Sequence, residues 1–326
     1  MQKRPGTPVP PEQSHEIISK YRDGHIALAE ALQMLSGKEV AAEPNPSHQL
    51  SKSRLYSILQ ELEDLVGLEE VKKTVREIFA LVYVKQERER HHLKSSPVVL
   101  HMVFKGNPGT GKTTVARLLG RMFRECGLLT KGHLVEVERA DLVGEYIGHT
   151  AQKTKEAVNR ALGGVLFIDE AYSLARGGDK DFGRESIDTL VKSMEDHRDE
   201  FIAIIAGYER EMEGFLKANP GLPSRFPIHL TFPNYSVATL LKIAKQMALR
   251  HQYNMQYDAE QKLRKHLQDL HQTSQLKNFS NARWVRNTIE RAIRKHAVRI
   301  FDVEQPSRTD LMTLTAADFV WEGDVL

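Results

Sequence analysis

The stretch KGNPGTGKTTVARLL, residues 105–119, decides the fold of this 326-residue chain. It contains the pattern G-x-x-x-x-G-K-T, whose glycines let successive backbone N–H groups turn toward phosphate oxygens. The lysine of such a pattern reaches the β- and γ-phosphates, and the hydroxyl after it ligates Mg²⁺. An apolar run at 98–104 (VVLHMVF) precedes the motif and a helical pattern follows, as this motif requires. The sequence therefore predicts a nucleoside triphosphate site formed by Gly106, Asn107, Pro108, Gly109, Thr110, Gly111, Lys112, Thr113 and Thr114.

An acidic pair completes this predicted site. The segment GVLFIDEAY, residues 164–172, places Asp169 and Glu170 at the end of an apolar strand. We expect Asp169, together with Thr113, to hold Mg²⁺, and Glu170 to polarise the attacking water as the catalytic carboxylate. The predicted chemistry is therefore hydrolysis of the bound triphosphate.

Strand and helix patterns alternate through the middle of the chain. Further short apolar runs follow the first one: LVEVE (134–138), GVLFID (164–169), FIAIIAG (201–207) and PIHLTF (227–232). Strands separated by helices favour an α/β fold with a parallel sheet covered on both faces. Beyond Phe232 only helical patterns remain. We therefore expect a partly flexible extension with short helices at 1–53, an α/β core with leading helices at 54–233, and a small all-helical domain at 234–326.

Composition narrows the class of protein. The 46 basic and 43 acidic residues give a net charge of +3, which is too small to argue for a nucleic-acid partner. A single cysteine, Cys126, excludes an internal disulfide framework and fits a reducing compartment, where its expected role is helix packing. The sequence has no signal-peptide pattern and no apolar run of about 18 residues. We therefore expect a cytoplasmic protein without a membrane span.

Four segments carry a resemblance to a known family: LVGEYIGHTAQKTKEAV (142–158), LFIDEAYSLARG (166–177), IIAGYEREMEGFLKANPGLPSRF (204–226) and FSNARWVRNTIERA (279–292). Together with the phosphate loop they resemble the CbbX/CfxQ branch of the AAA+ ATPases, and the chain is most similar to its members from spore-forming bacteria. The resemblance implies a P-loop AAA+ core with a five-stranded parallel sheet, a helical lid, and ATP with Mg²⁺ as cofactors. It also implies a homo-oligomeric ring of six chains that remodels a protein substrate, with a role in sporulation.

The same resemblance assigns further residues to the ATP site. Val66 and Gly67 match the turn that precedes the core beside the nucleotide. Arg225 matches the finger that one subunit supplies to its neighbour's site, where a guanidinium neutralises charge on the γ-phosphate. Arg283 matches the arginine of the lid that senses this phosphate, and Arg286, one turn further on, is the weaker candidate.

A pore loop is the third implied feature. Tyr146, Ile147 and Gly148 match the loop whose aromatic side chain grips a polypeptide in the central channel. An exposed tyrosine is suited to this role because it offers a rigid, amphipathic surface to many peptide sequences. The residue pattern alone would place Tyr146 in a loop or in the core.

The sequence departs from the family at one position, and two alternative functions remain. Many AAA+ proteins end the fourth core strand with a polar residue that positions water, whereas this chain has Gly207 and Tyr208. A nucleic-acid-associated motor or loader is one alternative, because Lys and Arg recur at 283–299, although a solvated helix face explains them more simply. The other is a scaffold that recruits partners in its ATP-bound state and threads nothing.

Overall fold

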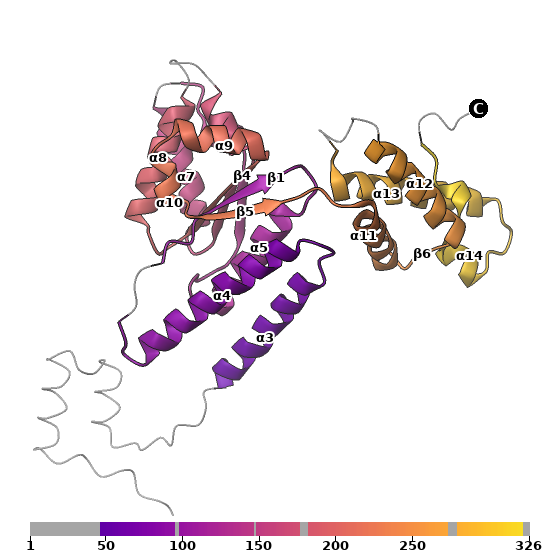
Figure 1. Ribbon diagram of the computed structural model, residues 1–326, viewed down its shortest axis with the longest axis horizontal. Helices are drawn as coiled ribbons and strands as arrows, with labels where there is room; N and C mark the ends of the chain where they lie inside the picture. Colours follow the sequence, from indigo (N-terminus) through magenta and orange to yellow (C-terminus); the bar gives the residue numbers. More distant parts are fainter. Residues whose placement is uncertain (1–45, 95–97, 147, 177–181, 273–278, 322–326) are drawn as a thin grey trace, which may run out of the picture. The chain divides into compact units, whose positions relative to one another are not determined.

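The computed structural model describes residues 46–94, 98–146, 148–176, 182–272 and 279–321 (Figure 1). The chain divides into two units between Lys52 and Ser53, and the fold below is that of the second. Its centre is a five-stranded sheet with the order β2-β3-β4-β1-β5, in which all neighbouring strands are parallel. The strands are β1 (Met102–Gly106), β2 (Leu134–Val137), β3 (Val165–Ile168), β4 (Ile202–Gly207) and β5 (Ile228–Phe232).

Helices cover both faces of this sheet, because side chains alternate between the faces along each strand. On β1, Met102 and Phe104 pack into one buried cluster, while Val103 packs into the other. The first cluster includes residues of α4 (Glu69–Arg90), of α5 (Lys112–Glu125) and, from Leu55 onward, of α3 (Pro46–Glu63). The second includes α6 (Arg139–Leu142), α7 (His149–Ala161), α8 (Gly183–Asp196), α9 (Glu209–Ala218) and the short helices η1 (Ala171–Ala175) and α10 (Leu222–Arg225).

The sequence expectations for the core are confirmed. Each of the five apolar runs contains a strand, although β1 begins four residues after the start of its run at Val98. Cys126 lies buried at the end of α5, and burial raises the pKa of its thiol to about 11. A thiol with so high a pKa is a poor nucleophile, which agrees with a packing role. In the part of the chain that the structure describes, no helix is long and apolar enough to span a membrane.

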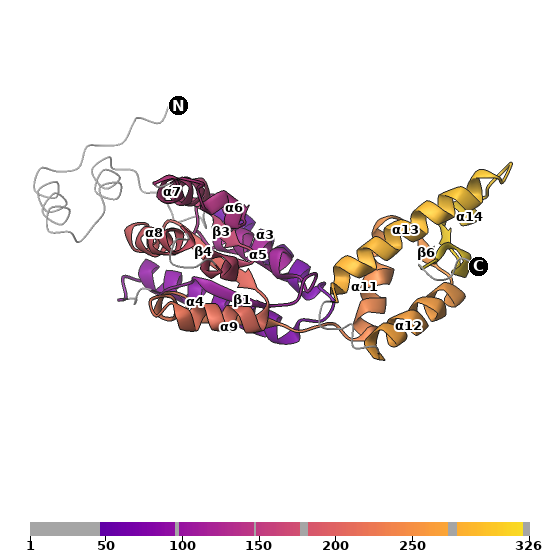
Figure 2. The same cartoon turned by 90° about the horizontal axis from the view of Figure 1, so that it is seen from above.

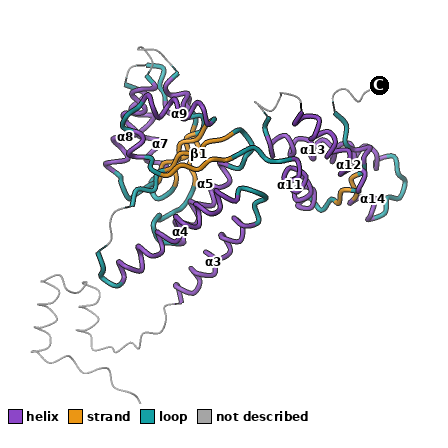
Figure 3. The backbone as a smooth tube through the Cα atoms, viewed as in Figure 1, coloured by secondary structure: helices purple, strands orange, loops and turns teal. Residues whose placement is uncertain are grey.

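A helical lid follows the core. It consists of α11 (Val237–Arg250), α12 (Tyr257–Gln272), α13 (Asn281–Phe301) and α14 (Arg308–Met312), and α11 packs against both α12 and α13 (Figure 2). The Ser236 hydroxyl caps α11 by accepting a hydrogen bond from the Thr239 N–H at 3.2 Å. One feature was not expected: β6 (Asn254–Met255) and β7 (Thr313–Leu314) form a two-stranded parallel pair in this helical domain (Figure 3). Strands of two residues leave no periodic pattern in a sequence.

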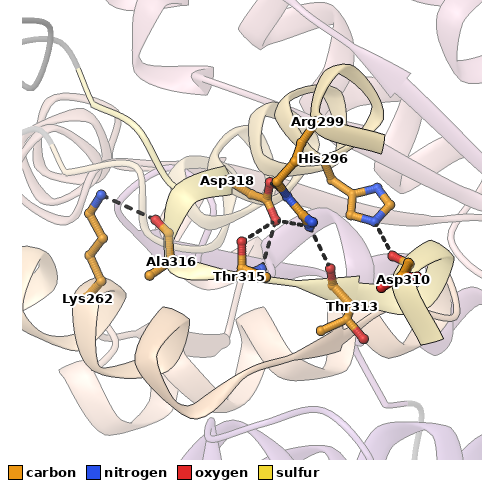
Figure 4. A network of polar contacts seen from close by, with 8 residues as sticks. All are labelled: Lys262, His296, Arg299, Asp310, Thr313, Thr315, Ala316 and Asp318. Atoms are coloured by element: carbon orange, nitrogen blue, oxygen red, sulfur yellow. Dashed lines mark hydrogen bonds and ion pairs between the residues drawn. The ribbon is translucent and has the colours of Figure 1, made fainter. Parts of the chain in front are cut away.

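A buried ion pair fixes the end of the lid (Figure 4). Arg299 on α13 donates to both carboxylate oxygens of Asp318, each at 2.9 Å, and Asp318 ends the short helix η3 (Ala316–Asp318). The Thr315 N–H donates to the same carboxylate at 2.7 Å. Burial alone would raise the pKa of Asp318, but the hydrogen bonds from Arg299 and Thr315 outweigh it and lower that pKa. Asp318 is therefore held as a carboxylate that joins α13 to the last turns of the lid.

Candidate active site

A pocket of about 340 Å³ opens at the carboxyl ends of β1, β3 and β4, where ligands bind in open α/β sheets. Its lining brings together most of the residues that the sequence predicts for the nucleotide: Val66, Gly106, Pro108, Gly109, Gly111, Lys112, Thr113, Thr114, Asp169, Glu170 and Arg283. Residues from the turn before α4, from the core and from the lid therefore meet in one cavity.

The phosphate loop is shaped by its glycines and by Lys112. Gly109 has a φ of 70°, and a Cβ there would lie 2.0 Å from the Ser280 carbonyl oxygen, so this position requires glycine. Lys112 begins α5, and its ammonium donates to the carbonyls of Gly106 at 2.7 Å and Asn107 at 3.0 Å. Burial lowers the pKa of Lys112, and the Asp169 carboxylate partly opposes this effect. The loop thus holds a half-buried cation beside the N-terminus of a helix, which suits a polyanion.

Three of the residues predicted to bind the nucleotide in the same chain, Gly67, Asn107 and Thr110, lie outside the pocket lining. Two of them, Asn107 and Thr110, stabilise the loop through hydrogen bonds. The Thr110 hydroxyl donates to the Asn107 carbonyl at 2.7 Å, and the Asn107 side-chain amide donates to the Asn234 side chain at 2.9 Å. The Tyr235 hydroxyl donates to the Thr110 carbonyl at 2.8 Å, and burial raises the Tyr235 pKa to about 12. These contacts tie the loop to the linker before α11.

The acidic pair lies at the end of β3. Asp169 accepts a hydrogen bond from the Glu170 N–H at 3.0 Å, and Glu170 has the left-handed backbone φ of 47° and ψ of 41°. A left-handed conformation is uncommon outside glycine, and strained residues of this kind concentrate at functional sites.

The side-chain oxygen atoms in and beside this pocket are suitable ligands for a magnesium ion. Thr113 and Asp169 line the same cavity, and a carboxylate oxygen of Glu136 lies 3.5 Å from the Thr113 hydroxyl. Mg²⁺ keeps several waters and is held by few protein oxygens together with substrate phosphates. Within the described ranges, no group of three or more His, Cys, Asp or Glu residues could hold an ion. A metal here would therefore depend on a bound phosphate chain.

The lid closes the pocket through Asn281, which is fully buried at the start of α13. Its side chain accepts from the Tyr235 N–H at 2.9 Å and donates to the Asn234 side chain at 2.9 Å and the Pro108 carbonyl at 3.3 Å. This network sets the register of α13, and both Arg283 and the weaker candidate Arg286 line the pocket.

The apolar end of the pocket was missed by sequence reasoning. Its lining includes Leu65, Leu68, Tyr235, Ile243 and Met247, with Arg250 at the end of α11. In the sequence, Ile243 and Met247 belong to an ordinary amphipathic helix, and no local signal separates a pocket wall from a core contact. An apolar wall of this kind suits a flat heterocycle.

Arg225 lies outside the pocket of its own chain. Its guanidinium donates to the Gly221 carbonyl at 3.0 Å and pairs with the Glu195 carboxylate on α8. Its Nε is buried and has no hydrogen-bond partner among the described residues. The structure therefore does not bring Arg225 to the site formed by Lys112 and Asp169 of the same chain.

The predicted pore residues lie just before α7. The Tyr146 side chain is 66% exposed, with its ring edge-on to His149 at 5.5 Å, and Gly148 caps α7 with a φ of 84°. Ile147 lies outside the described residues. A second cavity, of about 470 Å³, is lined both by Val143 and Glu145, which precede this loop, and by the acidic pair. Tyr146 therefore directly follows Glu145, a residue that lines the same cavity as Asp169 and Glu170.

Comparisons with known proteins agree with this geometry. Residues 102–234 match the family model described as "ATPase family associated with various cellular activities (AAA)", and residues 236–325 match the AAA lid domain. Stage V sporulation protein K of Bacillus subtilis (strain 168) is 53% identical over 298 residues, which cover 90% of this chain and 92% of that protein. The chain belongs to the AAA ATPases of the CbbX/CfxQ family.

Other members of the family share a lower sequence identity with this chain. A chloroplastic ribulose bisphosphate carboxylase/oxygenase activase of Cyanidioschyzon merolae is 43% identical, covering 85% of this chain and 94% of the relative. Protein CbbX of Cereibacter sphaeroides is 46% identical, covering 75% and 79%. The crystal structure of the FIGL-1 AAA domain with ADP shares the fold, with a TM-score of 0.53 at 19% identity over 78% of this chain and 80% of that one. The chain is therefore a nucleotide-binding ATPase with an AAA core and a helical lid.

Proposed function

We propose that this ATPase assembles into a homo-oligomeric ring of six chains and remodels a protein substrate by gripping it through pore loops. The observation that carries the proposal is the position of Arg225, whose guanidinium is held outside its own pocket by Glu195 and Gly221. A guanidinium that completes a phosphoryl-transfer site raises the rate about 10³- to 10⁵-fold in other enzymes. If Arg225 has this role, it acts in the pocket of a neighbouring subunit.

Within one subunit we assign roles by position in the pocket. The loop N–H groups and Lys112 would bind the phosphates, and Arg283 would contact the γ-phosphate from the lid. Thr113 and Asp169 would hold Mg²⁺, which supplies charge neutralisation on the β- and γ-phosphates when it is bound. Glu170 would orient and polarise the attacking water. Val66 and the apolar end of the pocket would take the adenine ring of ATP.

The proposed action on a protein substrate rests on the exposure of Tyr146 and on the names of the relatives. Tyr146 is exposed and directly follows Glu145, which lines the second cavity together with the acidic pair, so the proposed pore loop is close in sequence to a wall of the proposed hydrolytic site. One relative is named for stage V of sporulation and another for activating ribulose bisphosphate carboxylase/oxygenase. We infer a cytoplasmic role in sporulation from the first, and action on a protein from the second.

The test is the solution mass of the Glu170→Gln variant by light scattering, measured with ATP and then with ADP. The substitution removes the hydrolytic carboxylate and should trap ATP, so we expect a mass near six chains with ATP and a smaller one with ADP. A monomer with both nucleotides, when ATP binding has been demonstrated, would contradict the ring. Hydrolysis stimulated by DNA instead of protein would favour a nucleic-acid motor, and a function that survives Glu170→Gln would favour a scaffold.

A further inference from the structure

The first turn of α13 lies directly against the phosphate loop. A helix leaves its first backbone N–H groups without partners inside the helix, and Ser280, which precedes α13, provides no side-chain cap. The Ala282 N–H instead donates to the Gly109 carbonyl at 3.1 Å. A Cβ at Gly109 would lie 2.0 Å from the Ser280 carbonyl oxygen and 2.8 Å from the Arg283 backbone nitrogen, so loop and helix are in close contact. The phosphate loop therefore supplies part of the cap of a lid helix.

Asn281 makes a second contact with the same loop. Its side-chain nitrogen donates to the Pro108 carbonyl at 3.3 Å, so the consecutive carbonyls of Pro108 and Gly109 both accept from the start of α13. Asn281 is fully buried and has a φ of 45°, a left-handed conformation that asparagine adopts more readily than most residues. A buried polar side chain on such a backbone is costly unless its neighbours hold it, and residues of this kind concentrate at functional positions.

The partners of Asn281 fix the orientation of its amide. The Tyr235 N–H can only donate, so the side-chain atom 2.9 Å from it is the Asn281 oxygen. The Asn281 nitrogen then faces the Asn234 side chain at 2.9 Å, and the facing atom of Asn234 must be its oxygen. The same oxygen accepts from the side-chain nitrogen of Asn107, in the phosphate loop, at 2.9 Å. One carbonyl oxygen of Asn234 thus joins the loop to the lid.

These contacts determine where the side chain of Arg283 begins. Arg283 follows Asn281 by two residues on α13 and lines the nucleotide pocket together with Lys112. Because the first turn of α13 is bonded to the loop that carries the phosphates, the arginine is placed relative to that loop and not only relative to the rest of the lid. Such placement matters because a displacement of about 1 Å in a positioning element can cost about 100-fold in rate.

We propose that Asn281 is the positioning residue that holds Arg283 at the γ-phosphate, by anchoring α13 on the phosphate loop. The inference rests on the proposed contact of Arg283 with this phosphate. Asn281 is absent from the lining of the nucleotide pocket, so it acts through Arg283. The loop also has bonds that do not involve Asn281, from the Thr110 hydroxyl to the Asn107 carbonyl and from the Tyr235 hydroxyl to the Thr110 carbonyl. Loss of the anchor should therefore affect ATP more than ADP, which lacks the γ-phosphate.

The experiment measures the affinities of Asn281→Asp and of the wild type for ADP and for an ATP analogue with a non-hydrolysable β–γ bond. The change keeps the side-chain shape and the tolerance of a left-handed backbone, but it places an oxygen opposite the oxygens of Pro108 and Asn234. We expect affinity for the analogue to fall about tenfold, as for one lost buried hydrogen bond, and affinity for ADP to change less than about threefold. Asn254→Asp, at an exposed residue of β6, is the matched control and should leave both affinities unchanged.

A second variant tests the same anchor at the surface, in case the buried substitution unfolds the protein. Asn234→Ala removes an exposed side chain and with it the oxygen that joins Asn107 to Asn281, while the Pro108 and Gly109 contacts remain. We expect a smaller loss in the same direction, about threefold for the analogue and none for ADP. Thermal unfolding shows whether each variant is folded.

A double-mutant cycle separates positioning from a general structural role. If Asn281 acts only through the arginine, Asn281→Asp should cause no further loss of analogue affinity in the Arg283→Ala background, and the same holds for Asn234→Ala. Equal losses for the analogue and for ADP would overturn the inference, as would wild-type affinities in the folded variants or an undiminished loss in the Arg283→Ala background. Wild-type analogue affinity in Arg283→Ala alone would instead refute the role of Arg283, so the two failures are distinguishable.

Discussion

At the scale of single residues, Lys112 shows how the pocket is suited to an anion. Its ammonium is half-buried and, among the described residues, donates hydrogen bonds only to neutral carbonyls, and its partial burial lowers its pKa. A bound phosphate chain would replace these partners with charged oxygens, and hydrogen bonds between charged groups are roughly twice as strong as neutral ones. The lysine therefore gains more from nucleotide than from its resting contacts.

Replacing Lys112 by alanine should therefore weaken ATP binding by about 100-fold, the equivalent of two strong charged hydrogen bonds. The measurement is the rise of the unfolding temperature with ATP, because a ligand that binds only the native state stabilises it by RT ln(1 + [L]/Kd). We expect a rise of several degrees for the wild type and none for Lys112→Ala at the same ATP concentration. Lys217→Ala, on the exposed surface of α9, is the control. An undiminished rise in Lys112→Ala would show that the phosphates bind elsewhere.

The residues that could be predicted from the sequence are those whose chemistry depends on neighbours in the chain. The phosphate loop and Asp169 followed from short motifs with fixed spacing. Tyr235 supports the loop across 125 residues, through its bond to Thr110, and no local pattern indicates such a contact. The same holds for the ring of Tyr172 on η1, which lies beside Gly207 of β4.

At the scale of elements, burial decided which features were predictable. The central strands β1, β3 and β4 are buried almost throughout and are nearly continuous apolar runs, whereas the edge strands β2 and β5 mix buried and exposed residues. Enough apolar residues remain in all five for the sequence to indicate them. The pair β6–β7 is too short for any period, and polar contacts such as that of Arg299 with the Thr313 carbonyl hold this part of the lid instead. Among these contacts, the Arg299–Asp318 pair stands out because the Asp318 side chain is only 1% exposed.

Asp318→Asn should lower the free energy of unfolding by about 2 kcal/mol at pH 7, because it leaves Arg299 without its charged partner while that side chain remains partly hydrated. The pKa of Asp318 is lowered by folding, so its contribution is fully present above the unfolded value of about 3.9 and is lost as the pH falls through the lower folded value. The difference between variant and wild type should therefore shrink below about pH 4.

Urea denaturation at pH 7 and at acidic pH measures this difference. Asp302→Asn, at an exposed position just after α13, should change stability by less than about 0.5 kcal/mol. Equal stability of Asp318→Asn and wild type at pH 7 would contradict the account of the lid, as would a difference that persists undiminished in acid.

At the scale of the whole molecule, the residues proposed for the ATP site do not all lie together. Lys112, Asp169, Glu170 and Arg283 line one pocket, whereas Arg225 is held by Glu195 beyond it. A head-to-tail interface between identical chains closes into a ring when its rotation allows, and every subunit then supplies one residue to the next. The sequence could suggest this arrangement only through family resemblance, because no pattern within one chain shows where a second chain binds.

The most direct test of a shared site is hydrolysis by mixed rings. Arg225→Ala chains keep Glu170 but supply no guanidinium, and Glu170→Gln chains keep Arg225 but lack the hydrolytic carboxylate, so each alone should be inactive. In an equal mixture about one site in four pairs an intact Glu170 with an intact Arg225 from the neighbour, and we expect about a quarter of the wild-type rate. Mixed assemblies, demonstrated by co-purification of differently tagged chains, that hydrolyse no faster than either variant alone would contradict the account.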